Sequence, residues 1–281
     1  MRRSAKAFAL PVVLALLAAG CVDIVGADVK QVVREEKHFD TEGKPEVMLS
    51  TFDGSIEVRP WNQPGVQVTI EKRGRDDADI RSIEVKTEQT GNRILVEARS
   101  QSHANRGLHI GWYVGRSAKF IVSVPAASDV NAKSGDGSID IEGVNGTIVL
   151  HSGDGSIRAR DLSGDVDVST GDGSVRMDGT FQTLRAHSGD GSLRIQAARG
   201  SAVTKDWDIT TGDGSVTLEI PDGLNAELDA HTGDGRISLS DVTVSNVQGE
   251  IRRNDVRGRL GSGGGALRIR TGDGSITLRK Q

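Results

Sequence analysis

The sequence predicts an all-β protein that folds as a β-solenoid, and three observations carry this prediction. Gly-Asp-Gly occurs seven times in the second half of the chain, and the first four copies follow a constant 18-residue period. Apolar and polar residues alternate between the copies, as they do in half-buried strands. Aromatic residues make up only 3% of the chain, which suits a thin aliphatic core between two narrow sheets. A fixed period of this length is typical of repeat proteins.

Residues 1–20 have the layout of an export signal. Three basic residues precede an apolar run from Ala7 to Ala18, which is too short to span a bilayer. The run leads into Leu17-Ala18-Ala19-Gly20-Cys21, which resembles the lipobox of bacterial lipoproteins. We therefore expect Cys21, the only cysteine, to become a lipidated N-terminus. A secretory signal with a chance cysteine near its cleavage site is the alternative.

Charge and anchoring narrow the range of partners. The net charge is −4, and removal of Arg2, Arg3 and Lys6 with the signal makes it −4 − 3 = −7. This balance argues against nucleic acid, whose binders use basic surfaces to displace counterions. Two or more acyl chains anchor a protein to a membrane without spanning it. The residue after the lipidated cysteine is Val22, whereas an inner-membrane retention signal has Asp at this position. In a two-membrane bacterium we therefore expect the protein to be attached to the outer membrane.

The pattern divides the chain into four regions. They are a signal (1–20), a lipidated cysteine with a charged tether (21–45), an N-terminal β-rich region that caps one end (46–125) and the repeat solenoid (126–281). No helix is expected after the signal. Alternation in the third region predicts strands at Ser55–Arg59, Val66–Glu71, Ser82–Thr87, Arg93–Ala98 and Phe120–Pro125.

Each 18-residue unit divides into two strands joined by two kinds of turn. Gly-Asp-Gly forms one, and a looser pattern, apolar-x-Gly-x-apolar, forms the other, as at Val144–Ile148 and Val256–Leu260. The 39-residue gap between Asp234 and Asp273 then corresponds to two units whose middle Gly-Asp-Gly has decayed. Equivalent aliphatic residues are expected to stack in one ladder: Ile139, Ile157, Val175 and Leu193.

Two other architectures share parts of this signature. An antiparallel meander uses the same Asp-Gly turns, but its many consecutive strands would leave one apolar face open. A left-handed hexapeptide helix has a coil of the same length, yet it needs an aliphatic residue at every sixth position. Counting from Ile139 reaches Asn145 and His151 instead. We therefore expect a right-handed solenoid with two strands per coil.

Three motifs precede the repeats and carry a family resemblance. They are Thr51-Phe52-Asp53-Gly54-Ser55-Ile56, Val58-Arg59-Pro60-Trp61 and Phe120-Ile121-Val122-Ser123-Val124-Pro125. With the serial repeats they resemble the bacterial putative-adhesin family of β-strand-repeat envelope proteins, over residues 46–281. The family is catalogued mostly as a domain of unknown function. The resemblance implies an exported or membrane-attached β-repeat protein, and some members are associated with envelope stress.

The repeated aspartates are expected to be turn formers. An Asp side chain can accept a hydrogen bond from the N–H two residues on, and the flanking glycines adopt φ > 0 without steric cost. The alternative is a cation ladder in a calcium-binding solenoid, although the nonapeptide calcium repeats place their Asp differently. The residues are Asp136, Asp154, Asp172, Asp190, Asp213, Asp234 and Asp273.

One irregular segment and one histidine pattern complete the candidate sites. The segment Ser100–Ala118 is a candidate binding loop, with packing over the solenoid end as the alternative; its candidate residues are His103, Arg106, His109, Trp112 and Arg116. Three histidines each precede a Ser/Thr-Gly-Asp-Gly turn and are expected to face solvent, two coils or more apart, too far to share a zinc ion. They are His151, His187 and His231.

The sequence favours binding over catalysis. A β-helix carbohydrate-active enzyme would need paired carboxylates, but these carboxylates repeat instead of converging, and no nucleophile or phosphate-loop motif is present. We therefore expect a lipid-anchored envelope protein that binds or scaffolds without a cofactor. Its expected partners are the membrane, envelope proteins or cell-wall polymers. A second copy could pair through the C-terminal edge at Ile276–Gln281, which has no obvious cover.

Overall fold

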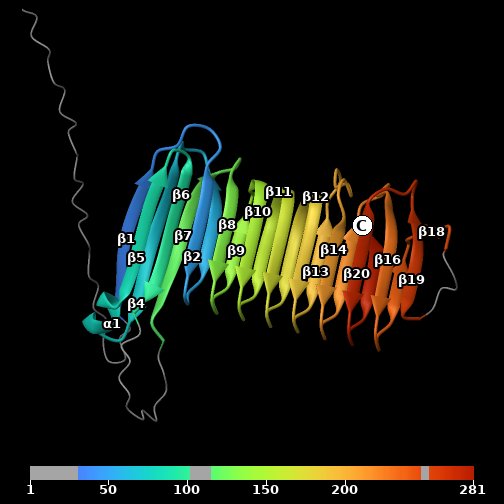
Figure 1. The fold of residues 1–281 in the computed structure, drawn as a ribbon. Coiled ribbons are helices and arrows are strands. Elements are labelled where there is room, and N and C mark those ends of the chain that lie inside the picture. Colours follow the sequence, from blue (N-terminus) through green and yellow to red (C-terminus); the bar gives the residue numbers. More distant parts are fainter. Residues whose placement is uncertain (1–30, 102–114, 248–252) are drawn as a thin grey trace, which may run out of the picture.

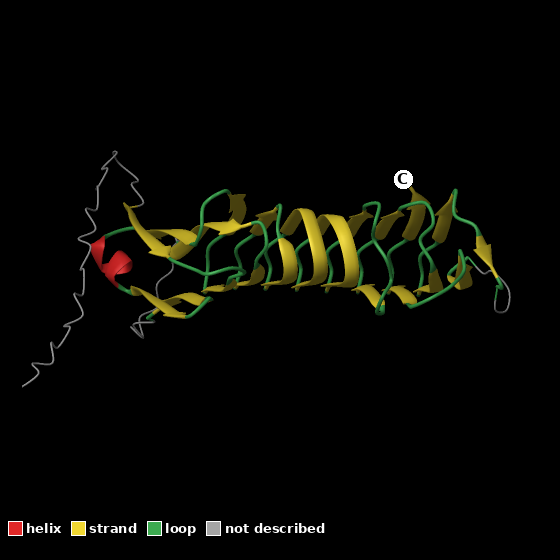
Figure 2. Cartoon of the chain, turned by 90° about the horizontal axis from the view of Figure 1, so that it is seen from above, coloured by secondary structure: helices red, strands yellow, loops and turns green. Residues whose placement is uncertain are grey.

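Stacked strands form an elongated rod in a computed structural model that describes residues 31–101, 115–247 and 253–281 (Figure 1). Seen from above, the strands lie in two layers with the connecting turns between them (Figure 2). Among the described residues one helix occurs, α1 (Asp77–Arg81), at one end of the rod. The all-β prediction is confirmed.

The first layer contains the strands that lead into the Gly-Asp-Gly turns, together with the strands that extend it at both ends. Neighbours in this layer are hydrogen-bonded to one another along the rod. In spatial order it contains β5 (Ile83–Thr90), β6 (Arg93–Ser100), β2 (Glu46–Thr51), β8 (Asp129–Ser134), β10 (Asn145–Ser152), the second half of β11 (Ile157–Thr170), the second half of β12 (Val175–Ser188), β14 (Trp207–Thr211), β20 (Ala266–Thr271), β16 (Ala226–Thr232), β19 (Asp255–Leu260) and β18 (Val244–Ser245).

The second layer contains the strands that leave these turns, together with three strands that extend it at the N-terminal end of the rod. The long strands β11 and β12 pass around a corner of the rod and belong to both layers. In spatial order the second layer contains β1 (Gln31–Phe39), β4 (Val66–Gly74), β7 (Ser117–Pro125), β3 (Ile56–Trp61), β9 (Ile139–Glu142), the first halves of β11 and β12, β13 (Leu193–Ala197), β15 (Val216–Ile220), β21 (Ile276–Lys280) and β17 (Ile237–Ser240).

The repeat units stack in the register that the period predicts. Ile157 pairs with Ile139 on one side and Val175 on the other, and Val175 pairs with Leu193. All four side chains are buried. The strands of the central units are parallel, which excludes the antiparallel meander for this part of the chain. The right-handed sense of the coil stays a prediction.

The interior is aliphatic, but it also holds large rings. Trp207 and Phe181 are fully buried and meet edge to face, with ring centroids 6.3 Å apart. Trp207 lies within the unit from Asp190 to Asp213, which is longer than the units before it, and Phe181 lies in the preceding unit. The loop that this extra length supplies, 198–206, follows β13 and precedes Trp207. The expectation of a thin aliphatic core is therefore wrong at these rings and at Phe120, which is also fully buried.

The N-terminal end differs from the predicted tether and boundary. Residues 31–39, expected in the tether, form the edge strand β1, which pairs with β4. The short helix α1, which the sequence does not predict, contacts β1, β4 and β5 and is capped by Asp76, whose carboxylate accepts a 2.8 Å hydrogen bond from Asp79 N. The sheet also runs without a break across the boundary expected at residue 125, because β2 pairs with β8.

The C-terminal unit lies inside the rod and not at its end. Strand β20 lies between β14 and β16, and β21 lies between β15 and β17 (Figure 1). The C-terminal strand is therefore not a free edge, and pairing of two copies through Ile276–Gln281 lacks the open edge that it needs.

Two further expectations for this region are corrected. Val256–Leu260, predicted as a turn, belongs to β19, which runs antiparallel to β16. The segment between Asp234 and Asp273 does not form two stacked coils, because its strands β18 and β19 pair antiparallel to each other at the end of the first layer. Residues 248–252 lie outside the described part.

The first repeat unit, like the last, lies between other strands of the rod. Strand β2 lies between β6 and β8, and β3 lies between β7 and β9. At each end of the rod, a strand pair from near one end of the chain therefore lies inside the stack, with other strands beyond it. The order of the coils differs from the order of the sequence at both ends.

Candidate functional site

The hydroxyl group that precedes a Gly-Asp-Gly turn closes the turn at four of the seven copies, through a hydrogen bond from the second glycine of the motif: Gly137, Gly155, Gly191 and Gly235. Gly155 N donates a 3.0 Å hydrogen bond to Ser152 Oγ, and this hydroxyl donates a 2.9 Å bond to the main-chain oxygen of Gly137 in the neighbouring coil. The equivalent residues are all buried: Thr51, Ser134, Ser152, Thr170, Ser188, Thr211, Thr232 and Thr271. The predicted closure by the Asp side chain is wrong, since the buried hydroxyl satisfies the turn from inside the coil.

The motif glycines are required by close stacking. Their φ angles lie outside the left-handed region, so the predicted reason for glycine is also wrong. A Cβ on Gly155 would lie 2.3 Å from the main-chain oxygen of Gly137, and one on Gly153 would lie 2.4 Å from that of Gly135. Successive turns are so close that there is no room for a side chain on either glycine.

The repeated aspartates form an exposed acidic edge. Main-chain hydrogen bonds from Gly272 to Gly212 and from Gly233 to Gly272 place Asp273 between Asp213 and Asp234. In the part of the chain that the structure describes, none of the seven repeated aspartates forms an ion pair, and no group of three or more His, Cys, Asp or Glu is placed to hold a metal ion. The seven are Asp136, Asp154, Asp172, Asp190, Asp213, Asp234 and Asp273.

Asp53 occupies the equivalent turn of the first unit, and its surroundings differ. It is half-buried, unlike the seven exposed aspartates. Burial and the neighbouring charge of Asp136 raise the pKa of the Asp53 carboxyl above its ordinary value. The acidic edge therefore carries an electrostatic cost where it meets the N-terminal region.

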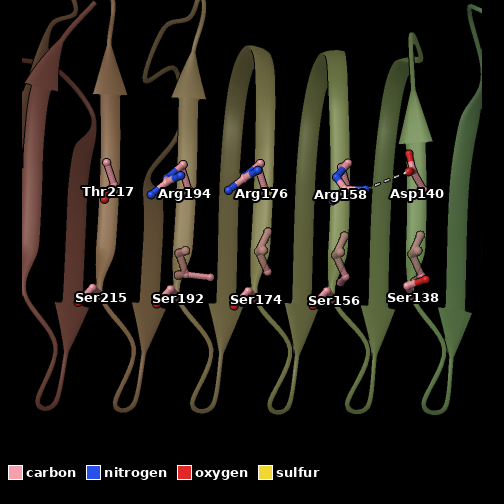
Figure 3. Close-up of a pocket in the computed structure, with 14 residues that line it drawn as sticks. Ser138, Asp140, Ser156, Arg158, Ser174, Arg176, Ser192, Arg194, Ser215 and Thr217 are labelled. Carbon is pink, nitrogen blue, oxygen red and sulfur yellow. Dashed lines mark ion pairs between the residues drawn. The ribbon is translucent and has the colours of Figure 1, made fainter.

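A shallow groove of about 560 Å³ follows the outer face of the second layer, beside the acidic edge (Figure 3). Two rows of side chains line it, each with one residue per coil. The row nearer the turns is Ser138, Ser156, Ser174, Ser192 and Ser215. The second row is Asp140, Arg158, Arg176, Arg194 and Thr217. Three arginines and one carboxylate give the groove an excess of two positive charges, in a chain whose net charge is −4.

The serine row presents hydroxyl groups to solvent. All five serines are exposed, in contrast to the buried hydroxyls on the other side of each turn. The hydroxyls of Ser138, Ser156, Ser174 and Ser192 form no hydrogen bond with any described residue. A hydroxyl can donate one hydrogen bond and accept two, so this row is a line of unused donors and acceptors.

The arginine row places like charges opposite one another. Arg158 is in register with Arg176, and Arg176 with Arg194, on neighbouring parallel strands. Strands in a sheet lie about 4.8 Å apart, and like charges in facing positions are destabilising. Figure 3 shows the three side chains side by side along the groove. Arg176 and Arg194 are exposed and form no ion pair with any described residue.

Asp140 does not neutralise the arginine row, because its carboxylate also contacts arginines outside the row. Its carboxylate lies 3.7 Å from Arg158, but also 3.0 Å from Arg59 and 3.4 Å from Arg160. Arg160 is in addition 2.7 Å from Glu142. The contacts of Asp140 are concentrated at the β9 end, so positive charge remains over β12 and β13.

Arginines on the outer face of the first layer have acidic neighbours instead. Arg185 lies 4.0 Å from Asp167, and Arg257 lies 3.2 Å from Asp229. Arg270 also pairs with Asp229, and these contacts hold the pKa of that carboxyl below its ordinary value although partial burial opposes the shift. Pairing of opposite charges is the usual arrangement on that face, so the uninterrupted row in the groove is a local exception.

The histidine pattern lies on the first layer, away from the groove. His151 Nδ1 is 2.8 Å from Ser169 Oγ, and His187 Nδ1 is 2.9 Å from Thr210 Oγ1. Both histidines are exposed, as predicted. His231 is partly exposed, and its Nδ1 lies 3.1 Å from Asp255 Oδ2. No two of these histidines occupy neighbouring strands.

The candidate loop and the lipidation site lie outside the described residues. They are His103, Arg106, His109, Trp112 and Cys21. Arg116, the candidate of this segment that the structure describes, donates a 2.9 Å hydrogen bond to Ser82 Oγ at the N-terminal end of the rod. In the described ranges, no helix is long and apolar enough to cross a membrane.

Sequence reasoning missed the groove although its signal is present. Arg158, Arg176 and Arg194 recur at the 18-residue period, each at the fourth position after the Asp of a turn. A comparison of equivalent positions in successive repeat units, and not of the Gly-Asp-Gly motif alone, identifies these three arginines. The period-2 rule would then place them outward, between buried neighbours such as Val175 and Met177.

A family profile described as Toastrack DUF4097 matches residues 46–202 and 164–279. The two matches together span the first unit, the repeats and the inserted C-terminal unit. This chain belongs to the Toastrack family. The resemblance to a β-strand-repeat family of unknown function is thereby confirmed.

Several solved structures match most of this Toastrack chain at low sequence identity. A putative cell adhesion protein from Clostridium sporogenes is 14% identical, with 88% of this chain and 99% of that chain covered and a TM-score of 0.40. A putative adhesin from Parabacteroides merdae is 11% identical, with 88% and 95% covered and a TM-score of 0.43. A putative adhesin from Bacteroides fragilis is 12% identical, with 90% and 99% covered and a TM-score of 0.39. No curated protein matches the chain.

Proposed function

We propose that this Toastrack protein is an adhesin-like binding module of the cell envelope, acting without catalysis. The observation that carries the proposal is the groove of the second layer, where Arg176 and Arg194 stand in register, exposed and without an acidic partner among the described residues. Such a row is costly in the free protein, because like charges face each other. A bound anion that neutralises the row removes this cost.

The proposed β-solenoid supports this role mechanically. Its groove-lining strands β11, β12, β13 and β15 are joined by continuous parallel pairing, and each buries its inward residues. The positions of the serines and arginines are therefore fixed by the sheet, as in binding sites built on rigid elements. The backbone therefore needs little ordering when a partner binds, and the ordering that remains is that of the arginine side chains.

We also propose a lipid anchor at Cys21 and, in a two-membrane bacterium, an outer-membrane location. The supporting observation is the lipobox-like sequence from Leu17 to Cys21. Growth with a clickable palmitate analogue should label the wild-type protein and leave a Cys21→Ser variant unlabelled. Equal labelling of both proteins would reject the anchor. The family resemblance suggests a link to envelope stress, which induction of the protein by an envelope-damaging antibiotic would test.

Binding to isolated cell envelopes tests the proposed function. We expect the purified mature protein to sediment with envelope fragments, and an Arg176→Gln/Arg194→Gln variant to remain in the supernatant. The matched control is Arg185→Gln/Arg257→Gln, which removes the same charge from the first layer. Envelope binding that is equal in all three proteins would remove the groove from the function.

A further inference from the structure

We propose that the groove binds an acidic polysaccharide that lies along the rod and crosses successive coils. This inference rests on the proposed binding function and names its ligand class. The groove would hold carboxylate groups on the arginine row and sugar hydroxyls on the serine row. Three features of the groove point to this ligand: its charge, its hydroxyls and its period.

The charge of the groove selects an anion. Arg158, Arg176 and Arg194 face the same side of the second layer, and only Arg158 has a carboxylate nearby among the described residues, 3.7 Å away at Asp140. A guanidinium group binds a carboxylate through two parallel hydrogen bonds, which are stronger than bonds between neutral groups. Three such groups in one line fit several carboxylates on one molecule.

The serines select a ligand that is rich in hydroxyl groups. Ser156, Ser174 and Ser192 each lie two positions before the arginine of the same strand, on the same outer face. Their hydroxyls form no hydrogen bond within the described residues. A sugar ring that carries a carboxylate on one side and hydroxyls on the other matches this pairing. An anionic polymer without hydroxyls would leave the serine row unused.

The period of the groove selects a polymer. Each coil adds one serine and one arginine at the strand spacing of about 4.8 Å. One sugar unit of an extended polysaccharide covers a similar length, so consecutive acidic sugars meet consecutive coils. Weak contacts at each coil then add along the chain, as in multivalent binding.

The same face disfavours nucleic acids. Single-stranded nucleic acids are bound by positive grooves that contain aromatic side chains for base stacking. The lining residues of this groove include no aromatic residue. Each serine of the row also follows an exposed turn aspartate by two positions, and these aspartates would repel a ligand with phosphates on all of its units. An acidic glycan that turns carboxylates toward the arginine row keeps them away from the acidic edge.

Calorimetric titration of the purified mature protein with polygalacturonate tests the inference. We expect binding of polygalacturonate and none of dextran, a neutral glycan. Affinity should rise with the length of galacturonate oligomers and level off once they cover the three arginine coils. The Arg176→Gln/Arg194→Gln variant should lose about a hundredfold in affinity, which is about tenfold for each of its two lost charge-assisted contacts.

Matched variants show whether the loss is specific. Arg185→Gln/Arg257→Gln should bind polygalacturonate as the wild type does. Ser174→Ala/Ser192→Ala should weaken the binding of polygalacturonate but leave that of inorganic polyphosphate unchanged. Absence of polygalacturonate binding would overturn the inference. So would polyphosphate binding of equal strength combined with indifference to the serine substitutions, because a sugar is then not recognised.

The proposed binding face and the proposed ligand can be rejected separately. If the arginine variant loses envelope binding while polygalacturonate does not bind, the groove is the binding face and the acidic glycan is wrong. If envelope binding persists in that variant, the groove itself is not the binding face. The Arg176→Gln/Arg194→Gln variant should unfold at or slightly above the wild-type midpoint, because it removes like charges that face each other. The Arg185→Gln/Arg257→Gln control should unfold slightly below it, because Arg257 contacts Asp229. The serine variant should match the wild type, since its side chains are exposed.

Discussion

Ser152 joins two coils of the rod by donating a hydrogen bond of 2.9 Å to the main-chain oxygen of Gly137. The same hydroxyl accepts a bond from Gly155 within its own turn. A single buried side chain therefore both shapes a turn and fixes the neighbouring one. Repetition of this contact along the edge makes the turns a hydrogen-bonded column, in addition to the two layers of strands.

Removing this hydroxyl should destabilise the protein. Ser152→Ala leaves Gly155 N and Gly137 O without their partner, which costs about 2 kcal/mol in the free energy of unfolding. Ser152→Thr should cost little, because Thr occupies the same place at Thr170 and Thr211. Ser156→Ala is the matched control, since that hydroxyl is exposed and makes no bond to a described residue. Denaturant unfolding monitored by circular dichroism measures all three, and equal stability of the two alanine variants would contradict the role of Ser152.

The substitution Gly155→Ala should destabilise the protein more than the small size of the added methyl group suggests. The added Cβ would lie 2.3 Å from the main-chain oxygen of Gly137, so the two turns must move apart. We expect a loss of about 3 kcal/mol in the free energy of unfolding. Gly115→Ala is the control, because its Cβ would meet only Asp53 Oδ2 at an ordinary 3.4 Å. A Gly155→Ala protein as stable as this control would show that the turns are looser than described.

The inserted C-terminal unit gives an unusual prediction for a residue close to the chain end. Leu278 pairs with Leu218 on one side and Leu239 on the other and is 1% exposed. Leu278→Ala should therefore cost roughly 2 to 5 kcal/mol, as for a central core residue. Leu239→Ala, in the edge strand β17 and partly exposed, should cost about 1 kcal/mol. The reverse order of the two losses in chemical denaturation would place the C-terminal unit at the end.

Asp53 should lower stability at neutral pH. Its folded-state pKa is raised, by burial and then by Asp136, so the folded protein holds this proton more tightly than the unfolded chain. Stability is therefore lost as the pH rises through this range. We expect Asp53→Asn to raise the unfolding midpoint at pH 7 and to leave it unchanged at about pH 3, where both states are protonated. Asp154→Asn, on the exposed edge, should show a smaller rise at pH 7.

Asp229 should behave in the opposite way. Hydrogen bonds from Arg270, opposed by partial burial and aided by Arg257, lower the pKa of its carboxyl in the folded protein. Its contribution is present above the unfolded pKa and is lost as the pH falls through the folded one. Asp229→Asn should cost about 1 kcal/mol at pH 7, and the cost should fade below about pH 4. Asp167→Asn is the control, because its nearest arginine atom is 4.0 Å away.

The sequence predicts the stacked units well because the period acts on every coil alike. Ile139, Ile157 and Val175 recur at the 18-residue period, and parallel pairing in register is the arrangement that buries all three together. The alternation of apolar and polar residues fixes which side of each strand faces inward. These signals are local and repeated, so an error at one unit is corrected by its neighbours.

The order of the units is not predictable in the same way. Strand β20 is similar to β14 and β16 in length and pattern, so each of them offers a similar edge to its neighbours. The sequence indicates what a coil is but not which coil lies beside it. The insertion of the C-terminal unit and the antiparallel pairing of β19 follow from long-range competition between similar edges.

The most conspicuous motif does not mark the candidate site. Asp136 and its six equivalents point to the turns, where the structure assigns closure to buried hydroxyls such as Ser152. The arginine row has the same 18-residue period, but it is recognised only when the outward-facing residues of successive repeat units are compared. Its meaning also depends on which groups lie beside Arg176 and Arg194, and neighbours across strands are visible only in three dimensions.

The position of β20 and β21 has a consequence for how the protein matures. A repeat array usually grows by adding each new unit to the previous one, so it can fold from its first residue onward. Here the slot between β15 and β17 is filled by β21, which follows both of them in the sequence. We expect β16 and β17 to wait without these parallel neighbours until β20 and β21 have been made.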